Sequence, residues 1–309
     1  MTNAALRTLG ALTGAGVATL GYASVVERNA FTLRRFEVPV LPSGSRSLRV
    51  LCLSDMHLVP DQRRKIEWVR GLAALQPDLV IDTGDNLAHP QAVPAALRAL
   101  EPLFELPGAF VLGSNDYFSP KKKNPALYLY DHKRGLAKTP RLPTQELVEG
   151  LVGAGWVDLD NARTRMQVGG LDLELVGVDD PHLGYDRYAD VAAPAASDAA
   201  LTVGVCHAPY QRVLDQMTAD GAGLVLAGHT HGGQLCVPFY GALVTNCDLD
   251  TSRVKGVSRW WPGAGSQPSS AAPEHASWLH VSAGLGTSPY APVRFACRPE
   301  ATLLTLTAH

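Results

Sequence analysis

The sequence predicts an α/β layered domain, and three observations support that prediction. Short, uninterrupted apolar runs recur along the 309 residues and alternate with segments whose apolar residues have helical spacing. Hydrophobic residues make up 46% of the chain and charged residues 18%, which is enough apolar material for a large core. Two apolar runs are joined by a Gly-Gly pair, which indicates a hairpin and therefore antiparallel strands beside the parallel ones.

The predicted elements follow one another in a regular order. An alternating edge strand is expected at 33–40, then a buried strand at 47–54 and an amphipathic helix at 61–75. The next elements are strands at 77–85 and 108–116 and helices at 91–101 and 144–153, with an irregular stretch at 119–143. A hairpin is expected from 163–168 to 171–178, and further strands at 201–207, 223–229, 278–284, 293–297 and 302–307. The Pro-, Ser- and Ala-rich residues 262–277 predict a loop.

The N-terminal segment contains no charged residue from Thr8 to Val26, although about 20 apolar residues are needed to cross a bilayer. We expect residues 1–30 to form a hydrophobic, membrane-associated helix and residues 31–309 to form one domain. A signal peptide and an Ala/Gly-rich helix packed on the domain are the alternatives. One arginine precedes the segment and several follow it, which favours a domain on the cytoplasmic side, with a soluble cytoplasmic protein as the alternative.

Composition excludes several classes of protein. The 29 acidic and 27 basic residues give a net charge of −2, so nothing in the charge balance indicates nucleic-acid binding. The five cysteines are widely spaced and form no Cys-x-x-Cys pair, which argues against a zinc knuckle and a disulfide framework. The chain contains neither a phosphate-binding Gly-x-x-x-x-Gly-Lys-Ser/Thr loop nor a Gly-x-Ser-x-Gly nucleophile elbow.

Metal-binding residue types follow five of the predicted strands. In α/β sheets, sites form outside the carboxyl ends of the strands, so these side chains are expected to meet at one edge. Their oxygen and nitrogen donors suit divalent first-row ions such as Mn²⁺, Fe or Zn²⁺, and seven donors suit two ions that share a bridging carboxylate. The predicted ligands are Asp55, His57, Asp85, Asn115, His207, His229 and His231.

The ordered set Asp-x-His, Gly-Asp, a Gly-Asn-type loop, a lone His and Gly-His-x-His resembles the calcineurin-like metallophosphoesterases over residues 48–300. The resemblance implies a four-layer α/β/β/α sandwich of two mixed sheets flanked by helices, and a nucleophilic hydroxide held by two divalent metal ions. It assigns Asp55, His57, Asp85 and His231 to one ion. It assigns Asp85, as the bridge, with Asn115, His207 and His229 to the other.

The segments GHTHGGQ and GVDDP look similar to a bacterial branch of this family with an N-terminal membrane-associated segment. That branch includes enzymes that resemble UDP-diacylglucosamine pyrophosphohydrolases. The resemblance therefore implies a phosphorylated small molecule or lipid as substrate, and a membrane surface as a partner.

The chain departs from the family in one loop, which reads Gly113-Ser114-Asn115-Asp116 where the family reads Gly-Asn-His-Asp or Gly-Asn-His-Glu. Either Ser114 or Asn115 takes the ligand position, and we favour the amide oxygen of Asn115. The usual histidine acid is missing, because an amide cannot donate a proton at neutral pH. The proton would come from water or from another residue such as His89 or His182, or no acid is needed, since a good leaving group such as a phosphate would need less help.

The remaining candidates are weaker. We expect catalytic roles for Asn115, Asp116 and His229, and substrate contacts from His89, Asp180 and His182. Lys121, Lys122 and Lys123 are candidates for guiding an anionic headgroup, although a solvated loop is the simpler interpretation. Aromatic residues near the same loop are candidates to cap a pocket, and two tryptophans are candidates for membrane contact, with core packing as the default: Tyr117, Phe118, Tyr128, Tyr130, Trp260 and Trp261.

We expect a dinuclear, metal-dependent phosphohydrolase that cleaves a phosphodiester, a pyrophosphate or a lipid-linked phosphate. The first alternative is a non-catalytic binding scaffold of the same fold, with Gly-Ser-Asn-Asp as a degenerate loop. The second is a mononuclear hydrolase of another class, such as an amidase. The number of metal ions per chain separates the two enzymes, and metal binding with turnover separates both from the scaffold.

Overall fold

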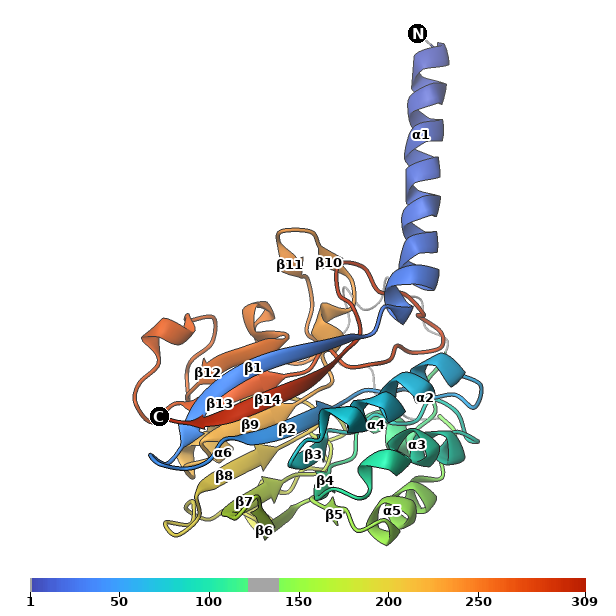
Figure 1. Ribbon diagram of the computed structural model, residues 1–309. Coiled ribbons are helices and arrows are strands. Elements are labelled where there is room, and N and C mark those ends of the chain that lie inside the picture. Colours follow the sequence, from blue (N-terminus) through green and yellow to red (C-terminus); the bar gives the residue numbers. More distant parts are fainter. Residues whose placement is uncertain (1, 122–138) are drawn as a thin grey trace.

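A computed structural model describes residues 2–121 and 139–309, and the side chains from residue 7 onward except residue 9. Its architecture is α/β, with two mixed six-stranded sheets packed face to face and helices on their outer sides (Figure 1). The predicted fold class is therefore confirmed.

The first sheet has the strand order β1-β14-β2-β3-β4-β5. All neighbouring pairs are parallel except β14 and β2, which run antiparallel. Because β2, β3 and β4 are parallel neighbours, the loops at their carboxyl ends lie along one edge of the sheet. The strands are β1 (Thr32–Leu41), β2 (Leu48–Leu53), β3 (Leu79–Asp82), β4 (Gly108–Phe110), β5 (Val157–Asp158) and β14 (Glu300–Ala308).

The second sheet has the order β12-β13-β9-β8-β7-β6. Its central strands β13, β9, β8 and β7 are parallel, and the outer strands β12 and β6 are antiparallel to their neighbours. The predicted hairpin is confirmed as β6 and β7, joined by Gly169 and Gly170, both with positive φ. The strands are β6 (Ala162–Val168), β7 (Leu171–Gly177), β8 (Leu201–Val205), β9 (Leu224–Ala227), β12 (Gly256–Trp260) and β13 (Ser277–Val281).

The hydrophobic core has three layers that follow this architecture. One layer lies between the first sheet and the helices α2, α3 and α5, a second fills the space between the sheets, and a third lies under α6 on the second sheet. The middle layer is built from alternate residues of facing strands, such as Val50 and Ile81 with Val203 and Leu226. The helices are α2 (Arg63–Arg70), α3 (Val93–Leu100), α4 (Ser114–Tyr117), α5 (Thr144–Gly153) and α6 (Gln211–Ala219).

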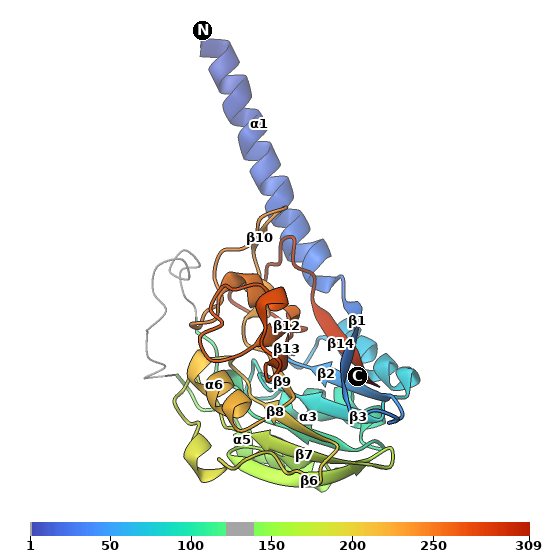
Figure 2. The same cartoon turned by 90° about the vertical axis from the view of Figure 1, so that its left-hand side faces the viewer.

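The N-terminal residues form a single helix, α1 (Thr2–Gly21), that projects from the domain (Figures 1 and 2). Every residue from Gly10 to Tyr22 is exposed, so none of these side chains is buried in the core of the domain. Two hydrogen bonds attach the segment that follows α1 to the domain. The Arg294 N–H donates to the Ala23 carbonyl at 3.1 Å, and the Cys297 N–H donates to Glu27 Oε1 at 2.7 Å. In the part of the chain that the structure describes, no helix combines the length and the hydropathy that crossing a bilayer requires.

Some sequence expectations need correction. Residues 293–297 are not a strand, because Phe295 makes only an isolated bridge to Leu235 and the positive φ of Ala296 ends the extended conformation. The predicted helix at 61–75 is α-helical only to Arg70 and continues as a 3-10 helix (Gly71–Leu75). The short strands β5, β12, β10 (Cys236–Val237) and β11 (Gly241–Ala242) were not predicted.

Candidate metal centre

The predicted ligands are carried by loops at the carboxyl ends of strands in both sheets. Asp55 and His57 follow β2, and Asp85 follows β3 in the same sheet. His207 follows β8, while His229 and His231 follow β9 in the second sheet. Because the sheets are stacked, their loops meet at one edge, as the sequence predicted.

One set of donors lies on the Asp55 side of Asp85. Asp55, His57, Asp85 and His231 each offer a ligand atom, and these four atoms all lie within 4.8 Å of one another. His57 Nε2 is 3.1 Å from His231 Nε2 and 3.4 Å from Asp85 Oδ2, and His231 Nε2 is 3.5 Å from Asp55 Oδ1. Two carboxylates and two imidazoles at this spacing form a suitable site for one first-row divalent ion.

A second set of donors lies on the other side of Asp85. His207 Nε2 is 3.5 Å from Asp85 Oδ1, and His229 Nδ1 is 3.4 Å from His207 Nε2. The side-chain amide of Asn115 donates to Asp85 Oδ2 at 2.6 Å, and its backbone N–H donates to Asp85 Oδ1 at 2.7 Å. Asp85 therefore stands between the two sets and touches members of both.

Backbone carbonyls orient three of the four imidazoles. His207 Nδ1 lies 2.7 Å from the Thr83 carbonyl, His231 Nδ1 lies 3.2 Å from the Gly286 carbonyl, and His229 Nε2 lies 3.1 Å from the Asn246 carbonyl. A carbonyl only accepts, so in each ring the proton sits on the nitrogen that faces the backbone. In the neutral ring the other nitrogen carries the lone pair and faces the cluster, which is the arrangement that metal-binding histidines use.

Burial and charge set the protonation of these groups. Burial lowers the pKa of His57 to about 4 and holds the pKa of His229 and His231 well below the ordinary value. Burial alone would raise the pKa of Asp85, but the charge and hydrogen bond of His207 hold it well below its usual range. His57, His229 and His231 are therefore neutral beside an ionised carboxylate, as metal binding requires. Burial alone would lower the pKa of His207, but the charge and hydrogen bond of Asp85 raise it well above the ordinary value, so His207 must lose a proton to bind a metal.

One further observation supports a divalent cation among these donors. Asp55 Oδ1 and His57 Nδ1 are buried and have no hydrogen-bond partner among the described residues. A buried carboxylate oxygen without a partner is costly, and a cation between it and the neighbouring imidazole nitrogens would satisfy it.

The backbone is strained at the same residues. Of the eleven non-glycine residues with positive φ in the described chain, five are predicted ligands: Asp55, His57, Asp85, His229 and His231. This left-handed conformation is uncommon for residues with a side chain, and it persists only where the surrounding structure imposes it. Its concentration at these five positions marks a site that is built for function.

Asp116 holds two of the loops together. Its buried carboxylate accepts hydrogen bonds from the backbone N–H groups of Asp85 at 2.8 Å, Asn86 at 2.8 Å, Leu87 at 3.2 Å and Gly113 at 3.0 Å. Burial and the charge of Asp85 raise the pKa of Asp116 to about 8, against the effect of these donors. All these partners are backbone groups, so the geometry favours a positioning role for Asp116.

Several supporting residues carried no recognisable signal in the sequence. Ser54 Oγ donates to Asp55 Oδ2 at 2.5 Å and receives a hydrogen bond from Thr83 Oγ1 at 2.7 Å. Buried Arg294 donates at 2.7 Å to the carbonyl of Gly286, the residue that also orients His231. Lys65 is buried and donates to the Met56 carbonyl at 2.6 Å, within the Asp-Met-His loop.

Two glycines allow the loops to approach. A Cβ at Gly228 would lie 1.9 Å from Ser54 Oγ, and one at Gly284, which has φ +66°, would lie 2.5 Å from Asp55 Cβ. No side chain fits at either position, which explains why the residue before His229 is glycine.

The weaker candidates fall into two groups. The ring of His182 lies 4.6 Å from that of His229 and its Nδ1 is 3.0 Å from the Tyr210 hydroxyl. Asp180 is buried beside the centre, where burial raises its pKa to about 7 and the charges of His207 and Asp85 act on it. His89 Nδ1 accepts a hydrogen bond from the backbone N–H of Gln91 at 3.1 Å, and no described contact joins His89 to the cluster.

The remaining sequence candidates lie either in the core or at and beyond the edge of the described residues. Trp260 and Trp261 are buried in the core layer of the second sheet, so the default interpretation holds for them. Lys121 lies at the edge of the described chain. Lys122, Lys123, Tyr128 and Tyr130 lie outside the described residues.

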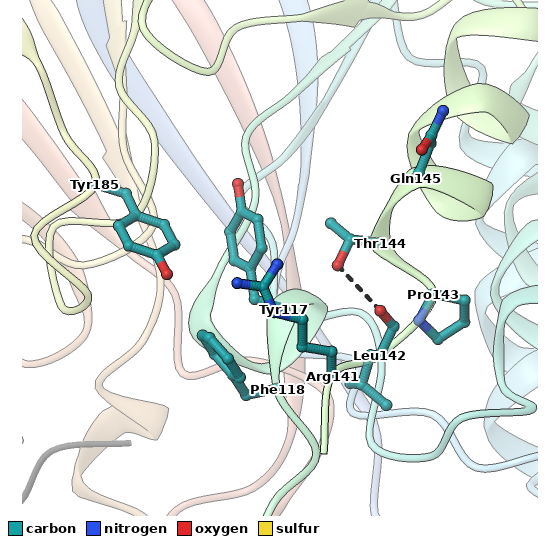
Figure 3. Close-up of a pocket in the computed structure, with 8 residues that line it drawn as sticks. All are labelled: Tyr117, Phe118, Arg141, Leu142, Pro143, Thr144, Gln145 and Tyr185. Atoms are coloured by element: carbon teal, nitrogen blue, oxygen red, sulfur yellow. Dashed lines mark hydrogen bonds between the residues drawn. The ribbon is translucent and has the colours of Figure 1, made fainter. Parts of the chain in front are cut away.

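A pocket of about 320 Å³ opens beside the Gly-Ser-Asn-Asp loop (Figure 3). Tyr117 and Phe118 follow Asp116 directly, and the Arg141 guanidinium lies 5.9 Å from the centre of the Phe118 ring. Tyr117 donates its hydroxyl hydrogen to Asp179 Oδ1 at 2.9 Å and contacts the ring of Tyr185 edge to face. The pocket thus lies between the residues that follow Asp116 and Tyr185, which is in the loop that carries Asp179, Asp180 and His182.

Comparison with known proteins identifies the family. The sequence model of the family described as "Metallophos: Calcineurin-like phosphoesterase" matches residues 48–233, which include every predicted ligand. The chain belongs to the calcineurin-like phosphoesterase family. Its buried Asp/His cluster is the metal-binding site expected of such a metallophosphoesterase.

Relatives of this metallophosphoesterase span almost the whole chain. It is 27% identical over 311 residues to the "Uncharacterized metallophosphoesterase YkuE" of Bacillus subtilis (strain 168), covering 96% of this chain and 92% of that protein. It is 26% identical to "Phosphodiesterase YaeI" of Escherichia coli (strain K12), covering 95% and 96%. Among solved structures it is similar to TT1561 of Thermus thermophilus, with a TM-score of 0.42, 15% identity and coverage of 78% and 91%.

Proposed function

We propose that this metallophosphoesterase binds two divalent metal ions and hydrolyses a phosphodiester, a pyrophosphate or a lipid-linked phosphate. The observation that carries the proposal is the position of Asp85, whose two carboxylate oxygens face different histidines, His57 at 3.4 Å and His207 at 3.5 Å. One carboxylate between two donor sets is what a bridging ligand requires. The likeness to a phosphodiesterase supports the phosphodiester class.

The two donor sets divide the predicted ligands. Asp55, His57 and His231 would hold one ion, Asn115, His207 and His229 the other, and Asp85 both. When bound, the ions supply charge stabilisation for the phosphoryl oxygens and activate water for in-line attack on phosphorus.

The chain's own residues would position and orient the substrate. Asp116 fixes the relation between the Gly-Asp and Gly-Ser-Asn-Asp loops, so Asn115 is held against Asp85. His182 stands beside His229 at the rim, where it is placed to contact a phosphate oxygen or leaving group. The pocket at Tyr117, Phe118 and Arg141 is placed to receive the organic part of the ester.

The loop change affects the choice of substrate. Where the family has a histidine acid, this chain has an amide, which cannot protonate a leaving group. The leaving group of a pyrophosphate or an activated ester departs without a strong acid, whereas the alkoxide of an alkyl phosphate does not. We therefore expect pyrophosphates and activated diesters to be better substrates than unactivated alkyl phosphates, and comparable rates for the two classes would contradict this.

The test joins metal analysis to turnover. Purified full-length protein is analysed by plasma emission spectroscopy and assayed with Mn²⁺ on bis-p-nitrophenyl phosphate and p-nitrophenyl phosphate. Two ions per chain with diester hydrolysis is the expected result. One ion per chain favours a mononuclear hydrolase, and neither metal nor turnover with any ion favours a binding scaffold.

We further propose that residues 1–30 form a unit distinct from the domain of residues 31–309 and hold it at a membrane, with the domain on the cytoplasmic side. The projection of α1 away from the domain supports this division (Figure 1). Removal of α1 (Thr2–Gly21), which keeps the Ala23 and Glu27 contacts to the domain, should transfer the protein to the soluble fraction and leave hydrolysis of soluble substrates intact. Unchanged fractionation would contradict the anchor.

A further inference from the structure

Exposed apolar side chains are concentrated at one end of this molecule. Fourteen large hydrophobic side chains are exposed in the described chain, and twelve of them belong to residues 12–26, residues 235–243 or Tyr290. The other two are Val152 and Tyr185. Scattered exposed apolar residues are ordinary, but a contiguous group marks an interaction surface.

The three segments meet in space although they are far apart in the sequence. Gln234 Nε2 donates to the Ala291 carbonyl at 3.0 Å, and Cys236 N–H donates to the Phe295 carbonyl at 2.9 Å. A groove of about 390 Å³ is lined by one side of α1 together with Leu235, Val293 and Phe295. Both ribbon views place the β10–β11 hairpin beside the base of α1 (Figures 1 and 2).

None of the three segments carries a charged residue. Asp, Glu, Lys and Arg are absent from 8–26, 232–247 and 281–293, in a chain in which 18% of residues are charged. Surfaces that face water or a polar partner normally include charges. The missing charge is therefore a shared property of these three segments, residues 8–26, 232–247 and 281–293, which together we call the apolar end.

The hairpin presents aromatic side chains at its tip. Between β10 and β11, Phe239 is fully exposed and Tyr240 is 77% exposed. Phe239 has φ +68°, a conformation that a bulky residue rarely adopts. The backbone thus bears a conformational cost to hold an aromatic ring in water, which is the opposite of what folding alone would favour.

We propose that the apolar end, with Phe239 and Tyr240 at its tip, docks on a lipid bilayer. The exposure of α1 favours lipid over a protein partner, because residues 10–22 are exposed on all sides of the helix. A protein or a second copy of the chain would cover one stripe, whereas lipid can contact an uncharged helical segment on every side. Phenylalanine and tyrosine at the tip suit the interface between acyl chains and headgroups.

Docking here would bring the metal centre close to the bilayer. The hairpin begins at Cys236, shortly after the His229-Thr230-His231 loop, and the chain returns to Asn246, whose carbonyl lies 3.1 Å from His229 Nε2. The surface does not depend on the proposed hydrolysis. If both are correct, the phosphoryl group attacked belongs to a molecule held in the membrane.

The decisive experiment places a reporter at residue 239 of the full-length chain. Phe239→Trp and, as a matched control, Val152→Trp on α5 are mixed with vesicles of phosphatidylethanolamine and phosphatidylglycerol containing brominated acyl chains. We expect strong quenching of the tryptophan at 239 beyond that of the unmodified protein, and none at 152. Equal quenching of the two variants overturns the proposal.

Vesicle flotation supplies the second measurement. The double substitution Phe239→Ser with Tyr240→Ser should weaken partitioning at least about tenfold, because two exposed aromatic rings lose their burial in lipid. Val152→Ser should not change it. Binding should persist at high salt and with phosphatidylcholine alone, since the surface is uncharged. Loss of binding in salt, or a Phe239-dependent dimer without lipid in ultracentrifugation, overturns the assignment to lipid.

Hydrolysis of bis-p-nitrophenyl phosphate separates this proposal from the proposed function. The serine variants should retain it, because neither tip residue contacts a predicted ligand. An inactive protein that still shows quenching at 239 would contradict the phosphohydrolase and leave the docking surface standing.

Discussion

The carboxylate of Asp116 accepts a hydrogen bond from the backbone N–H of Asp85 at 2.8 Å, and its second oxygen accepts one from Asn86 at the same distance. The residue that would bridge two ions is therefore positioned through its backbone by a carboxylate on the next loop. Asn115, the residue before Asp116, meets the side chain of Asp85 at the same time. The two loops act as one unit, and a change in either is expected to disturb both.

Asp116→Asn tests that unit. An amide keeps the size of the side chain but points N–H groups at backbone donors, so the Gly-Asp loop should lose its position. We expect kcat/KM to fall about 10–100-fold and metal affinity to fall with it, as for other residues that orient metal ligands. Turnover and Mn²⁺ titration measure the effect. Asp198→Asn, at an exposed carboxylate, is the control, and equal behaviour of the two variants would contradict the positioning role.

Asp85→Asn should remove both ions, because the amide is a weaker ligand at the position shared by the two donor sets. His231→Ala should weaken only the Asp55 side and leave one ion bound. The metal content per chain, measured together with bis-p-nitrophenyl phosphate turnover, distinguishes the two variants. A stoichiometry of two ions and near-normal turnover in Asp85→Asn would exclude the bridging role.

Ser114→Ala and Asn115→Ala decide which residue of the altered loop is a ligand. The Asn115 amide lies 2.6 Å from Asp85 Oδ2, so we expect Asn115→Ala to lose metal and activity while Ser114→Ala keeps both. The readout is the metal bound per chain at saturating Mn²⁺. The opposite pattern would assign the site to Ser114.

Arg141→Ala tests the pocket beside the loop. If Arg141 and Phe118 contact the organic part of the ester, loss of the guanidinium should raise KM for a bulky diester about fivefold, equivalent to about 1 kcal/mol, with kcat unchanged. The KM for p-nitrophenyl phosphate serves as the comparison. A uniform change for both substrates would indicate a structural effect.

His280 predicts sensitivity to acid. It is buried in β13, neither ring nitrogen has a hydrogen-bond partner among the described residues, and burial lowers its pKa from 6.5 to about 4. Only the unfolded chain binds a proton between these values. The free energy of unfolding is therefore undiminished above pH 6.5 and falls as the pH drops toward 4, by up to about 3 kcal/mol from this residue.

Urea unfolding of the metal-free protein at pH 7 and pH 4.5 measures this loss. His280→Leu should reduce the difference between the two pH values, because the residue that titrates on unfolding is gone. His275→Leu replaces an exposed histidine and should leave the difference unchanged. An equal loss in the unmodified protein and His280→Leu would show that His280 does not contribute.

The sequence predicted the strand ends well because local pattern determines them. An apolar run followed by Asp or His is visible without a fold, which is why Asp55, Asp85, His207 and His229 could be named before the sheets were built. The groups that orient these ligands lie elsewhere in the chain. Nothing local to Asn246, Gly286 or Arg294 indicates that their carbonyls or guanidinium meet histidines, because those contacts exist only after the two sheets stack.

Short elements were also beyond sequence reasoning. The strands β10 and β11 are two residues each, so no alternation of polar and apolar residues is long enough to detect. The segment 293–297 shows the reverse error. Its apolar composition resembles a strand, but Arg294 turns inward to bind carbonyls and Ala296 takes a left-handed conformation.

The position of β14 between β1 and β2 has a consequence for how this protein is made. Among the described residues β1 is an edge strand that pairs with β14 alone, so its hydrogen-bonding partners are translated almost a whole chain length later. Until residues 300–308 leave the ribosome, the backbone N–H and C=O groups of β1 lack the strand that they pair with in the folded protein. The first sheet is therefore completed late in synthesis, and a nascent chain that stalls before β14 would carry an open, aggregation-prone sheet edge.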